Sequence, residues 1–460
     1  MEKRTFVKVL KTSLFIILFF LNSCYIDTLH RNANNDKPLQ KIESVQLNFI
    51  GHWLGEGKKE QLIKEIINEF EFTNQDVKIN MKFPEEVYFD RRKDNIETVF
   101  NSKIALSENP EWDIIRINNE YTKVADSLRD PGWAKKYLVD FSEIPEFIKS
   151  TRPELLSDTV KALYGGIIPG PFIDGYNWPL WCNTEVAKKV GIEVKQFGMT
   201  NDDFLEYVKA VYEYNQKNGD SIIAVYEAWN WKTTHTIAQE LYFSEIDDYK
   251  EIMNEKYNEK KLLAWEKVLR ETEKLSKYKP LPEYRKISWT ETVNYPLKGK
   301  CLFYPNASWM YNMWLKLDSA KLKNMIPTEL PVFKHSPICF GGYQVTWAVP
   351  KKSPHRNNAI RFLLFINKPD VAEKWARYTK SPSGISGNLI SANFGFDRFE
   401  NFQYTMDKKY GQHKLNPVYN SLYIFGKENR DVNNFQLEVM SGTMTADQAM
   451  KEIKKQLKKI

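Results

Sequence analysis

The chain lacks the short motifs that most often carry catalysis or nucleotide binding. It contains no G-x-S-x-G nucleophile turn, no H-E-x-x-H zinc motif, no phosphate-binding G-x-x-x-x-G-K-[ST] loop and no C-x-x-C pair. Each of these motifs holds reactive or ligating groups at a spacing that a helix or a tight turn requires. The sequence therefore offers no catalytic constellation, and we expect a protein that is not an enzyme.

Histidine and cysteine are also scarce. The chain has 6 His and 4 Cys among 460 residues, and its histidines show no spacing typical of metal ligands. Cys182, Cys301 and Cys339 lie in or beside apolar segments, which indicates buried thiols. Because three is an odd number, at least one of them stays unpaired even if two form a bridge. We expect no metal and no cofactor.

Strong charge of one sign is absent as well. The formal net charge of +7 falls to +4 without residues 1–23, which hold four basic residues against Glu2, and this excess is too small to indicate nucleic-acid binding. A chain of 460 residues is longer than one core organises, so two lobes are expected. Aromatic residues make up 14% of the chain. Most should pack the cores, and the others suit a cleft for a partly apolar, hydroxyl-rich ligand.

The N-terminal residues predict export. A charged segment precedes an apolar run over 14–21, which is far shorter than the roughly 20 residues of a membrane-spanning helix and is typical of a signal peptide. Residues 21–24, Leu-Asn-Ser-Cys, resemble a bacterial lipoprotein box in which Cys24 is acylated, although Asn22 departs from the usual small residue. Ordinary cleavage nearby is the alternative. We expect a signal peptide over 1–23 and a flexible polar tether over 24–43, with the folded part outside the cytoplasmic membrane.

Strand and helix patterns alternate from residue 44 onward. An apolar strand is predicted over 45–50, a loop over 51–57, an amphipathic helix after it, and a second strand over 77–83. This order predicts parallel pairing in an α/β sheet, whose ligand crevice lies beyond the carboxyl ends of the strands. His52 and Trp53 follow the first strand directly, so both are candidate ligand-binding residues.

A second polar loop follows the strand predicted over 112–117. Asn118, Asn119 and Glu120 come directly after it, so this polar cluster at another strand end is a second candidate binding loop. Alternatively, the amides cap a helix that begins near Tyr121.

Two tryptophans follow the strand predicted over 221–226. Trp229 and Trp231 lie on either side of Asn230, an arrangement that suits sugar recognition because aromatic rings cover the apolar face of a pyranose while amides bond its hydroxyls. Packing in the core is the alternative role for these two rings.

Residues 163–192 mark a crossing between lobes. Their glycines and prolines favour turns and extended backbone as far as Trp178, and an apolar strand follows. Asn183 or Thr184 then caps a helix, which ends at Gly191.

Four segments together resemble the extracellular solute-binding proteins of ABC importers, in the family 1 form related to maltose-binding protein. They are Trp181-Cys182-Asn183 in the crossing, 298–304 followed by Ser308 and Trp309, Gly341-Gly342 before Tyr343, and the closing segment 441–449. In that family a tryptophan at the position of Trp309 commonly stacks on a bound sugar, and the backbone near Tyr343 approaches the cleft. The resemblance extends over residues 44–460.

The resemblance implies the two-lobe α/β fold of periplasmic binding proteins, similar to type II, with both lobes discontinuous in sequence and joined by a hinge. The implied first lobe contains 44–183 and 327–378, and the second contains 184–326 and 379–460. Crossings are implied near 183–186, 326–329 and 375–381.

The implied function is that of a lipid-anchored receptor, which captures a small solute between its lobes and delivers it to the permease subunits of an ABC importer. A mono- or oligosaccharide is the expected ligand, and a monomer that binds no nucleic acid is expected. The candidate ligand-binding residues are His52, Trp53, Asn118, Asn119, Glu120, Trp229, Trp231, Trp309 and Tyr343.

Two other functions fit the sequence. Carboxylates such as Glu56, Glu120 or Glu227 could form the pair, about 5 to 10 Å apart, that glycoside hydrolysis needs. The chain could also be a sensor that reports its ligand to a membrane kinase. A glycosidase assay tests the first alternative, and neighbouring permease or kinase genes would separate the importer from the sensor.

Overall fold

The computed structural model describes residues 44–83, 109–118, 122, 131–227, 236–254, 258–280, 293–386, 397–410, 414–415 and 434–457. Among the residues predicted to be functional, Cys24, Asn119, Glu120, Trp229 and Trp231 lie outside these ranges. Within the ranges, no helix combines the length and the apolar character needed to cross a membrane.

A parallel strand pair opens the fold, as the alternating pattern predicts. Strands β1 (Val45–Ile50) and β2 (Val77–Lys82) pair in register, and helix α2 (Lys58–Thr73) connects them. The strand predicted over 112–117 is shorter than expected: it consists only of β3 (Ile115–Arg116). The Asp113 carboxylate accepts a hydrogen bond from the Asn48 backbone amide at 2.9 Å, so a side chain takes the place of a ladder partner. Strand β10 (Trp347–Ala348) pairs antiparallel with β3.

A four-stranded sheet lies further along the chain, in the order β6-β7-β5-β8. Its strands are β5 (Leu180–Asn183), β6 (Ile223–Val225), β7 (Cys301–Pro305) and β8 (Met325–Thr328). Strand β6 is parallel to β7, whereas β5 is antiparallel to both β7 and β8. Cys182 on β5, Cys301 on β7 and Cys339 are buried, as predicted, and all three are free thiols.

A third sheet carries the chain between the two regions. Strands β4 (Asp174–Asn177) and β9 (Cys339–Gln344) are antiparallel, and β11 (Lys414–Leu415) pairs with β9. The backbones of β4 and β9 come very close: a Cβ on Gly341 would lie 2.5 Å from the Tyr176 carbonyl oxygen, and a Cβ on Gly175 would lie 2.7 Å from the Gly342 oxygen. The glycines that the sequence places here are therefore required by packing.

Local capping sets the helix after the crossing, as expected. The Asn183 side chain accepts hydrogen bonds from the Glu185 and Val186 amides at 2.9 and 3.0 Å, and α9 (Thr184–Val190) ends at Gly191 with a φ of 83°. The longer helices near the four-stranded sheet are α10 (Asn201–Asn218), α11 (Thr236–Ile246), α13 (Glu259–Ser276), α15 (Met310–Leu322), α18 (Arg398–Tyr410) and α21 (Ala446–Leu457).

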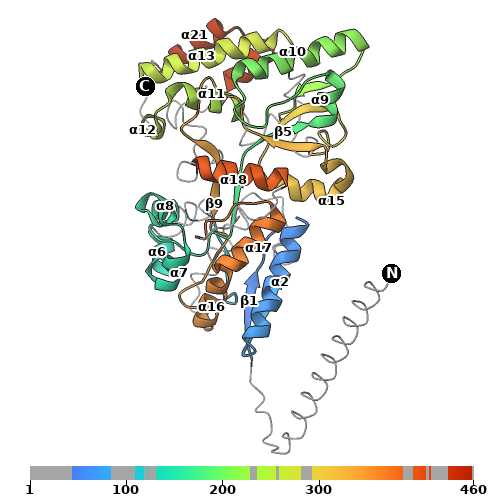
Figure 1. Cartoon of the computed structure of the whole chain (residues 1–460). Coiled ribbons are helices and arrows are strands. Elements are labelled where there is room, and N and C mark those ends of the chain that lie inside the picture. The colour runs from blue at the N-terminus through green and yellow to red at the C-terminus, as the bar shows by residue number, and fades with distance from the viewer. Residues whose placement is uncertain are drawn as a thin grey trace, which may run out of the picture. The chain divides into compact units, whose positions relative to one another are not determined.

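None of the remaining described helices is longer than α11, and most of them lie in the part of the fold that contains β1. In Figure 1, α2, α16 and α17 lie side by side, and their residues are in contact. These helices are α6 (Trp133–Tyr137), α7 (Pro145–Ser150), α8 (Asp158–Leu163), α12 (Tyr249–Met253), α16 (Arg356–Ile366), α17 (Pro369–Thr379) and α20 (Asn434–Met440), with 3-10 turns at Phe141–Glu143 and Pro153–Leu156.

Two large hydrophobic clusters organise the fold. The first core draws its buried residues from 47–173 and 345–385, and the second core from 176–340 and 439–453. The chain passes from the first to the second core between Ile173 and Tyr176, and it returns between Phe340 and Val345. These two changes take place at the paired strands β4 and β9, and the chain enters the second core again between Ile385 and Val439. The lobe boundaries predicted from the resemblance stay a prediction.

Candidate ligand-binding site

His52 and Trp53 follow β1, but the Trp53 ring is part of the first core. Trp53 is only 4% exposed, and its ring centroid lies 5.2 Å from that of Trp347 and 4.7 Å from that of Trp375. Its φ of 70° is unusual for a bulky residue. Surrounding packing has to hold such a strained backbone in place. Strained backbone conformations of this kind are often found at functional sites. The predicted ligand contact of Trp53 remains a prediction.

His52 connects this loop to β3. Its ring centroid is 4.9 Å from that of Trp53, and its Nε2 lies 3.3 Å from an Arg116 guanidinium nitrogen. Burial, followed by the positive charges of Arg116 and Lys59, holds the pKa of His52 well below its usual range. The imidazole is therefore neutral at neutral pH, and its Nε2 can accept a hydrogen bond from Arg116 while Nδ1 donates elsewhere.

A buried ion pair lies beneath the same loop. Lys59 Nζ is 2.8 Å from Asp174 Oδ2, and the two side chains are 3% and 9% exposed. The Trp375 indole donates to the other Asp174 oxygen at 3.0 Å, and Lys59 Nζ lies 5.4 Å from the Trp53 ring centroid. Burial raises the pKa of the Glu56 carboxyl, while the Lys59 ammonium opposes that rise and the Asp174 carboxylate adds to it. This network holds the loop after β1 against β4.

Sequence reasoning missed Lys59, Asp174 and Arg116. A signal for Lys59 was present: it occupies the position three residues before Leu62 and four before Ile63, on the stripe that α2 buries. A charged residue on a buried stripe needs a partner. The partner, Asp174, is 115 residues away, and nothing in the sequence around it indicates that it pairs with Lys59.

Trp309 lies where β7 leads into α15, in contact with the second core. Its ring is partly buried, with its centroid 5.2 Å from that of Tyr176 and 5.3 Å from that of Trp178. Hydrogen bonds fix the residues before it. The side-chain amide of Asn306 donates to the Tyr304 hydroxyl at 2.6 Å, and the backbone amide of Ser308 donates to the Asn177 carbonyl at 2.9 Å. Rings and backbone thus fix the orientation of a partly exposed indole, which a stacking platform needs.

Tyr343 makes contacts that connect β9 to α18. Its hydroxyl donates to Asp407 Oδ1 at 2.5 Å, and the Arg152 guanidinium lies 5.1 Å from its ring centroid. Arg152 also pairs with Asp407 Oδ2 at 2.5 Å. The two contacts of Asp407 join α18 to the first core, because Tyr343 packs against that core.

Helix α15 also meets the loop that follows Trp53. Lys316 Nζ donates to the Gly55 carbonyl at 3.2 Å, and the buried Asn312 amide donates to the Thr379 carbonyl at 2.7 Å. The helix that begins after Trp309 therefore touches the segment that carries His52 and Trp53.

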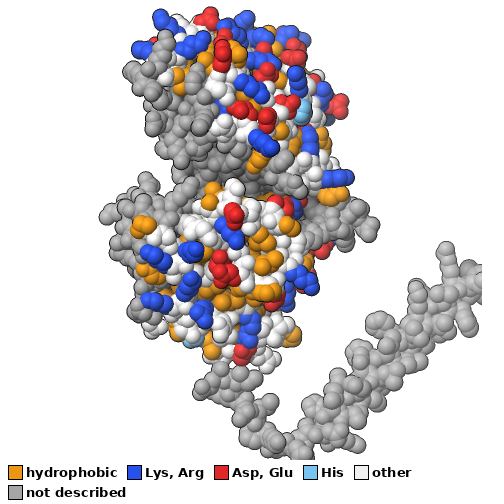
Figure 2. All heavy atoms as spheres, turned by 90° about the vertical axis from the view of Figure 1, so that its left-hand side faces the viewer, with side chains coloured by type: hydrophobic (Ala, Val, Ile, Leu, Met, Phe, Trp, Pro, Cys, Tyr) orange, Lys and Arg blue, Asp and Glu red, His pale blue; other side chains and the backbone are white. Residues whose placement is uncertain are grey.

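The remaining described candidates lie at other strand ends. Asn118 is partly buried, and its carbonyl accepts from the Thr122 hydroxyl at 2.9 Å and from the Thr122 amide at 3.2 Å. Glu227, after β6, is 5% exposed. No group of three or more His, Cys, Asp or Glu that could hold a metal ion occurs among the described residues. Figure 2 shows basic and acidic side chains interspersed on the face that it presents, in keeping with the mild net charge.

Comparison with known proteins gives relatives over nearly the whole chain. The melibiose/raffinose/stachyose-binding protein MelE of Bacillus subtilis (strain 168) is 23% identical over 438 residues, which cover 92% of this chain and 88% of MelE. A sugar transporter from Bacillus licheniformis, solved in complex with stachyose, has a TM-score of 0.53 at 18% identity and covers 90% of this chain and 99% of its own. The GacH receptor of Streptomyces glaucescens, solved without ligand and with acarbose, has a TM-score of 0.62 at 13% identity. The match covers 88% of this chain and 96% of the GacH chain.

These structural similarities show the two-lobe α/β fold of the periplasmic binding proteins, so the predicted fold class is confirmed. A family model described as a bacterial extracellular solute-binding protein matches residues 66–387. That family consists of binding proteins, which confirms the predicted receptor role and argues against the hydrolase alternative. The chain belongs to the bacterial extracellular solute-binding protein family.

Proposed function

We propose that this protein is a lipid-anchored receptor that captures an oligosaccharide and delivers it to the permease subunits of an ABC importer. The observation that carries the sugar assignment is the set of ligands named for its relatives: melibiose, raffinose and stachyose for MelE, and stachyose and acarbose for two solved structures. A lipid on Cys24 would hold the folded part at the outer side of the cytoplasmic membrane.

The geometry around Trp309 supports a sugar ligand. A pyranose has an apolar face that stacks on an indole, and its hydroxyls need donors and acceptors. Trp309 is partly exposed and braced by Tyr176 and Trp178, so its ring can stack without first being ordered. We propose that His52, Trp53, Asn118 and Tyr343 contact the sugar from the first lobe, together with Asn119 and Glu120, and that Trp229 and Trp231 join Trp309 in the second.

We further propose that the lobes close around the sugar. A ligand that contacts both lobes binds the closed form more tightly, and only that difference shifts the population toward closure. The proposed lobes are 44–183 with 327–378 and 184–326 with 379–460, and the chain segments that cross between them act as the hinge. The chain passes from one hydrophobic core to the other at β4 and again at β9, which supports a hinge in that region.

The experiment is a titration of the detergent-solubilised full chain with melibiose, raffinose, stachyose, maltotriose and glucose by calorimetry. Solution scattering with and without the tightest ligand should show compaction, and chromatography should recover that sugar unchanged. Hydrolysis of the sugar, or a tight complex whose scattering profile equals that of the free protein, would defeat the receptor mechanism. A panel in which no saccharide binds would defeat the sugar assignment.

A further inference from the structure

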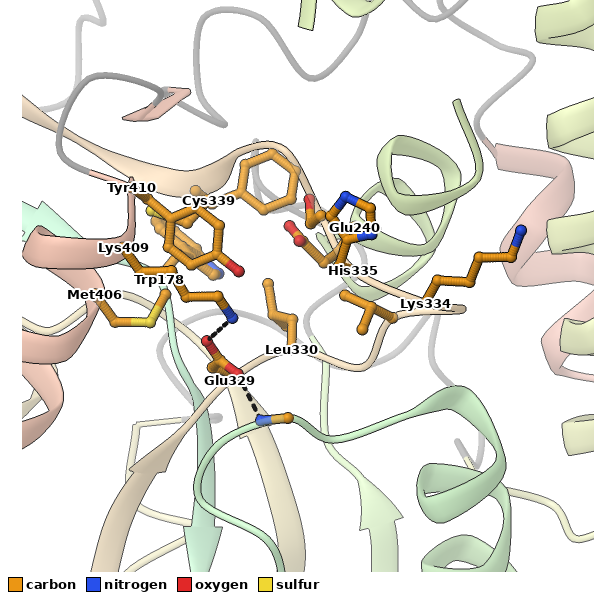
Figure 3. A pocket seen from close by; sticks show the side chains of 14 residues that line it. Trp178, Glu240, Glu329, Leu330, Lys334, His335, Cys339, Met406, Lys409 and Tyr410 are labelled. Carbon is orange, nitrogen blue, oxygen red and sulfur yellow. Dashed lines mark hydrogen bonds and ion pairs between the residues drawn. The ribbon is translucent and has the colours of Figure 1, made fainter. Parts of the chain in front are cut away.

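A small cavity lies between α11, the end of α18 and the segment 329–340, and its lining includes Trp178, whose ring also packs against Trp309. Its volume is about 60 Å³. The cavity is lined by Trp178, Glu240, Glu329, Leu330, Phe340 and Tyr410, among others. Figure 3 shows the side chains of Trp178, Glu240, Glu329, Leu330 and Tyr410 around it. A single water molecule needs about 10 to 15 Å³ of such cavity volume, so the cavity can hold a few waters or a small ion, but a hexose does not fit. The cavity is thus too small to be the proposed sugar site.

Two buried polar atoms at this cavity lack a partner in the described part of the chain. They are Oε2 of Glu240 and Nε1 of Trp178, on residues that are 4% and 3% exposed. Figure 3 shows the Glu240 carboxyl group and the Tyr410 hydroxyl both directed toward the space between them. A buried carboxylate oxygen without a partner is costly, so this atom points to a ligand.

The charges around the cavity do not balance. Glu329 pairs with Lys409 at 2.9 Å and accepts a hydrogen bond from the Gly198 amide at 2.6 Å, so that carboxylate is satisfied. His335 also lines the cavity, and its Nε2 lies 2.8 Å from Asp247 Oδ1. Burial raises the pKa of Glu240 to about 8, since a Ser336 hydroxyl offsets little of the cost and the Glu329 charge adds to it. Lys334 also lines the cavity, but Figure 3 shows its ammonium group turned away from the Glu240 carboxyl group. Because Lys409 is already paired with Glu329, an ionised Glu240 has no adjacent ammonium group of its own among these lining residues.

We propose that this cavity binds a small monovalent cation of ammonium size, with Glu240 as its counter-ion. The Tyr410 hydroxyl supplies a second oxygen, and the aromatic residues Trp178 and Phe340 line the same cavity. A divalent metal is a poor fit, because such ions take six or more oxygen ligands and no cluster of three acidic, His or Cys residues occurs in the described ranges. The proposed site joins α11 to α18 and is distinct from the proposed sugar site, although Trp178 both lines the cavity and packs against Trp309.

Thermal unfolding of the full chain tests this site. At about pH 8 and constant ionic strength, sodium chloride is replaced stepwise by ammonium, potassium, methylammonium or tetramethylammonium chloride. We expect a saturable rise in melting temperature of about 2 °C or more with ammonium or potassium, because a ligand of the native state stabilises it by mass action. Tetramethylammonium is too large and should give none. The cation that raises the melting temperature most indicates the size of cation that the cavity accepts.

Variants separate a specific site from a general salt effect. Glu240→Gln should abolish the ion-specific rise, while the control Glu245→Gln on the same helix, whose partner is Lys267, should keep it. If Glu240→Gln does not fold, Tyr410→Phe should still shift the half-saturating ion concentration upward several-fold. A melting temperature that responds to pH but equally to all four salts would mean that a proton occupies the site, and the proposal would be wrong. An ion-specific rise that survives Glu240→Gln would also overturn it.

Discussion

Lys59 Nζ lies 2.8 Å from Asp174 Oδ2 in a place where neither side chain is more than 9% exposed. The pair joins the first turn of α2 to β4. Removal of one partner of a buried pair leaves an uncompensated charge, which costs about 3 to 5 kcal/mol. We therefore expect Lys59→Met to lower the free energy of unfolding by that amount in chemical denaturation.

The matched control for that variant is Lys64→Met on the same helix. Lys64 pairs with Glu60 at 2.7 Å, but its side chain is 52% exposed, so the loss should stay below about 1 kcal/mol. Equal losses in the two variants would mean that the Lys59 pair is not buried in solution.

Trp309→Ala should weaken sugar binding by about 1 to 3 kcal/mol and leave the fold largely intact, if the ring is the stacking platform. Calorimetry with the tightest sugar measures the first effect and thermal unfolding without sugar measures the second. The control is Trp314→Ala, because Trp314 is fully buried and its indole donates to the Val293 carbonyl at 2.7 Å, so its loss should act on stability. A large fall in the melting temperature of Trp309→Ala would instead assign that ring to the core.

Arg152, Tyr343 and Asp407 should behave as one coupled unit. Tyr343→Phe removes the hydroxyl that donates to Asp407, and Arg152→Met removes the ion pair to the same carboxylate. The stability losses from removing two partners of the same carboxylate do not simply add. A double-mutant cycle should therefore give a coupling free energy of about 0.5 to 3 kcal/mol. Strictly additive losses in urea denaturation would show that the two contacts are independent.

The stability of the native protein should depend on pH through Glu240. Its native pKa is about 8 against an ordinary value of 4.5, so between these values the native state holds a proton that the unfolded chain has released. The free energy of unfolding therefore falls as pH rises through this window, by up to about 1.4 kcal/mol per pH unit from this group. Glu240→Gln should show a shallower decline than the wild-type protein in denaturation series from about pH 4.5 to about pH 8. Parallel profiles would exclude a proton on native Glu240.

Cys24→Ala should release the protein from the membrane fraction of the producing bacterium, because the acyl chains of a lipoprotein are attached through that thiol. Fractionation of cells that express the full-length wild-type and variant chains measures this effect. The Cys339→Ala variant serves as the control, since that thiol is buried in the fold. Equal membrane retention of Cys24→Ala and wild type would defeat the lipoprotein prediction.

The local features of the fold were predictable because their causes lie within a few residues. Asn183 caps α9 through amides two and three positions away, and Gly191 ends that helix because its φ is positive. The strand and helix around α2 follow from apolar spacing alone. The family could be predicted too, since it depends on the order of such local segments along the chain.

The candidate site was predictable only in part. The sequence indicates which residues follow strands, and His52, Trp53, Asn118 and Trp309 do so. It does not indicate that Trp347 and Trp375 enclose Trp53, or that Asp407 reaches Arg152 across 255 positions. The cavity beside Glu240 likewise combines residues from five parts of the chain. Local hydrogen bonding and periodicity determined the elements, whereas burial and charge pairing depend on which distant surfaces pack together, and only the tertiary structure decided that.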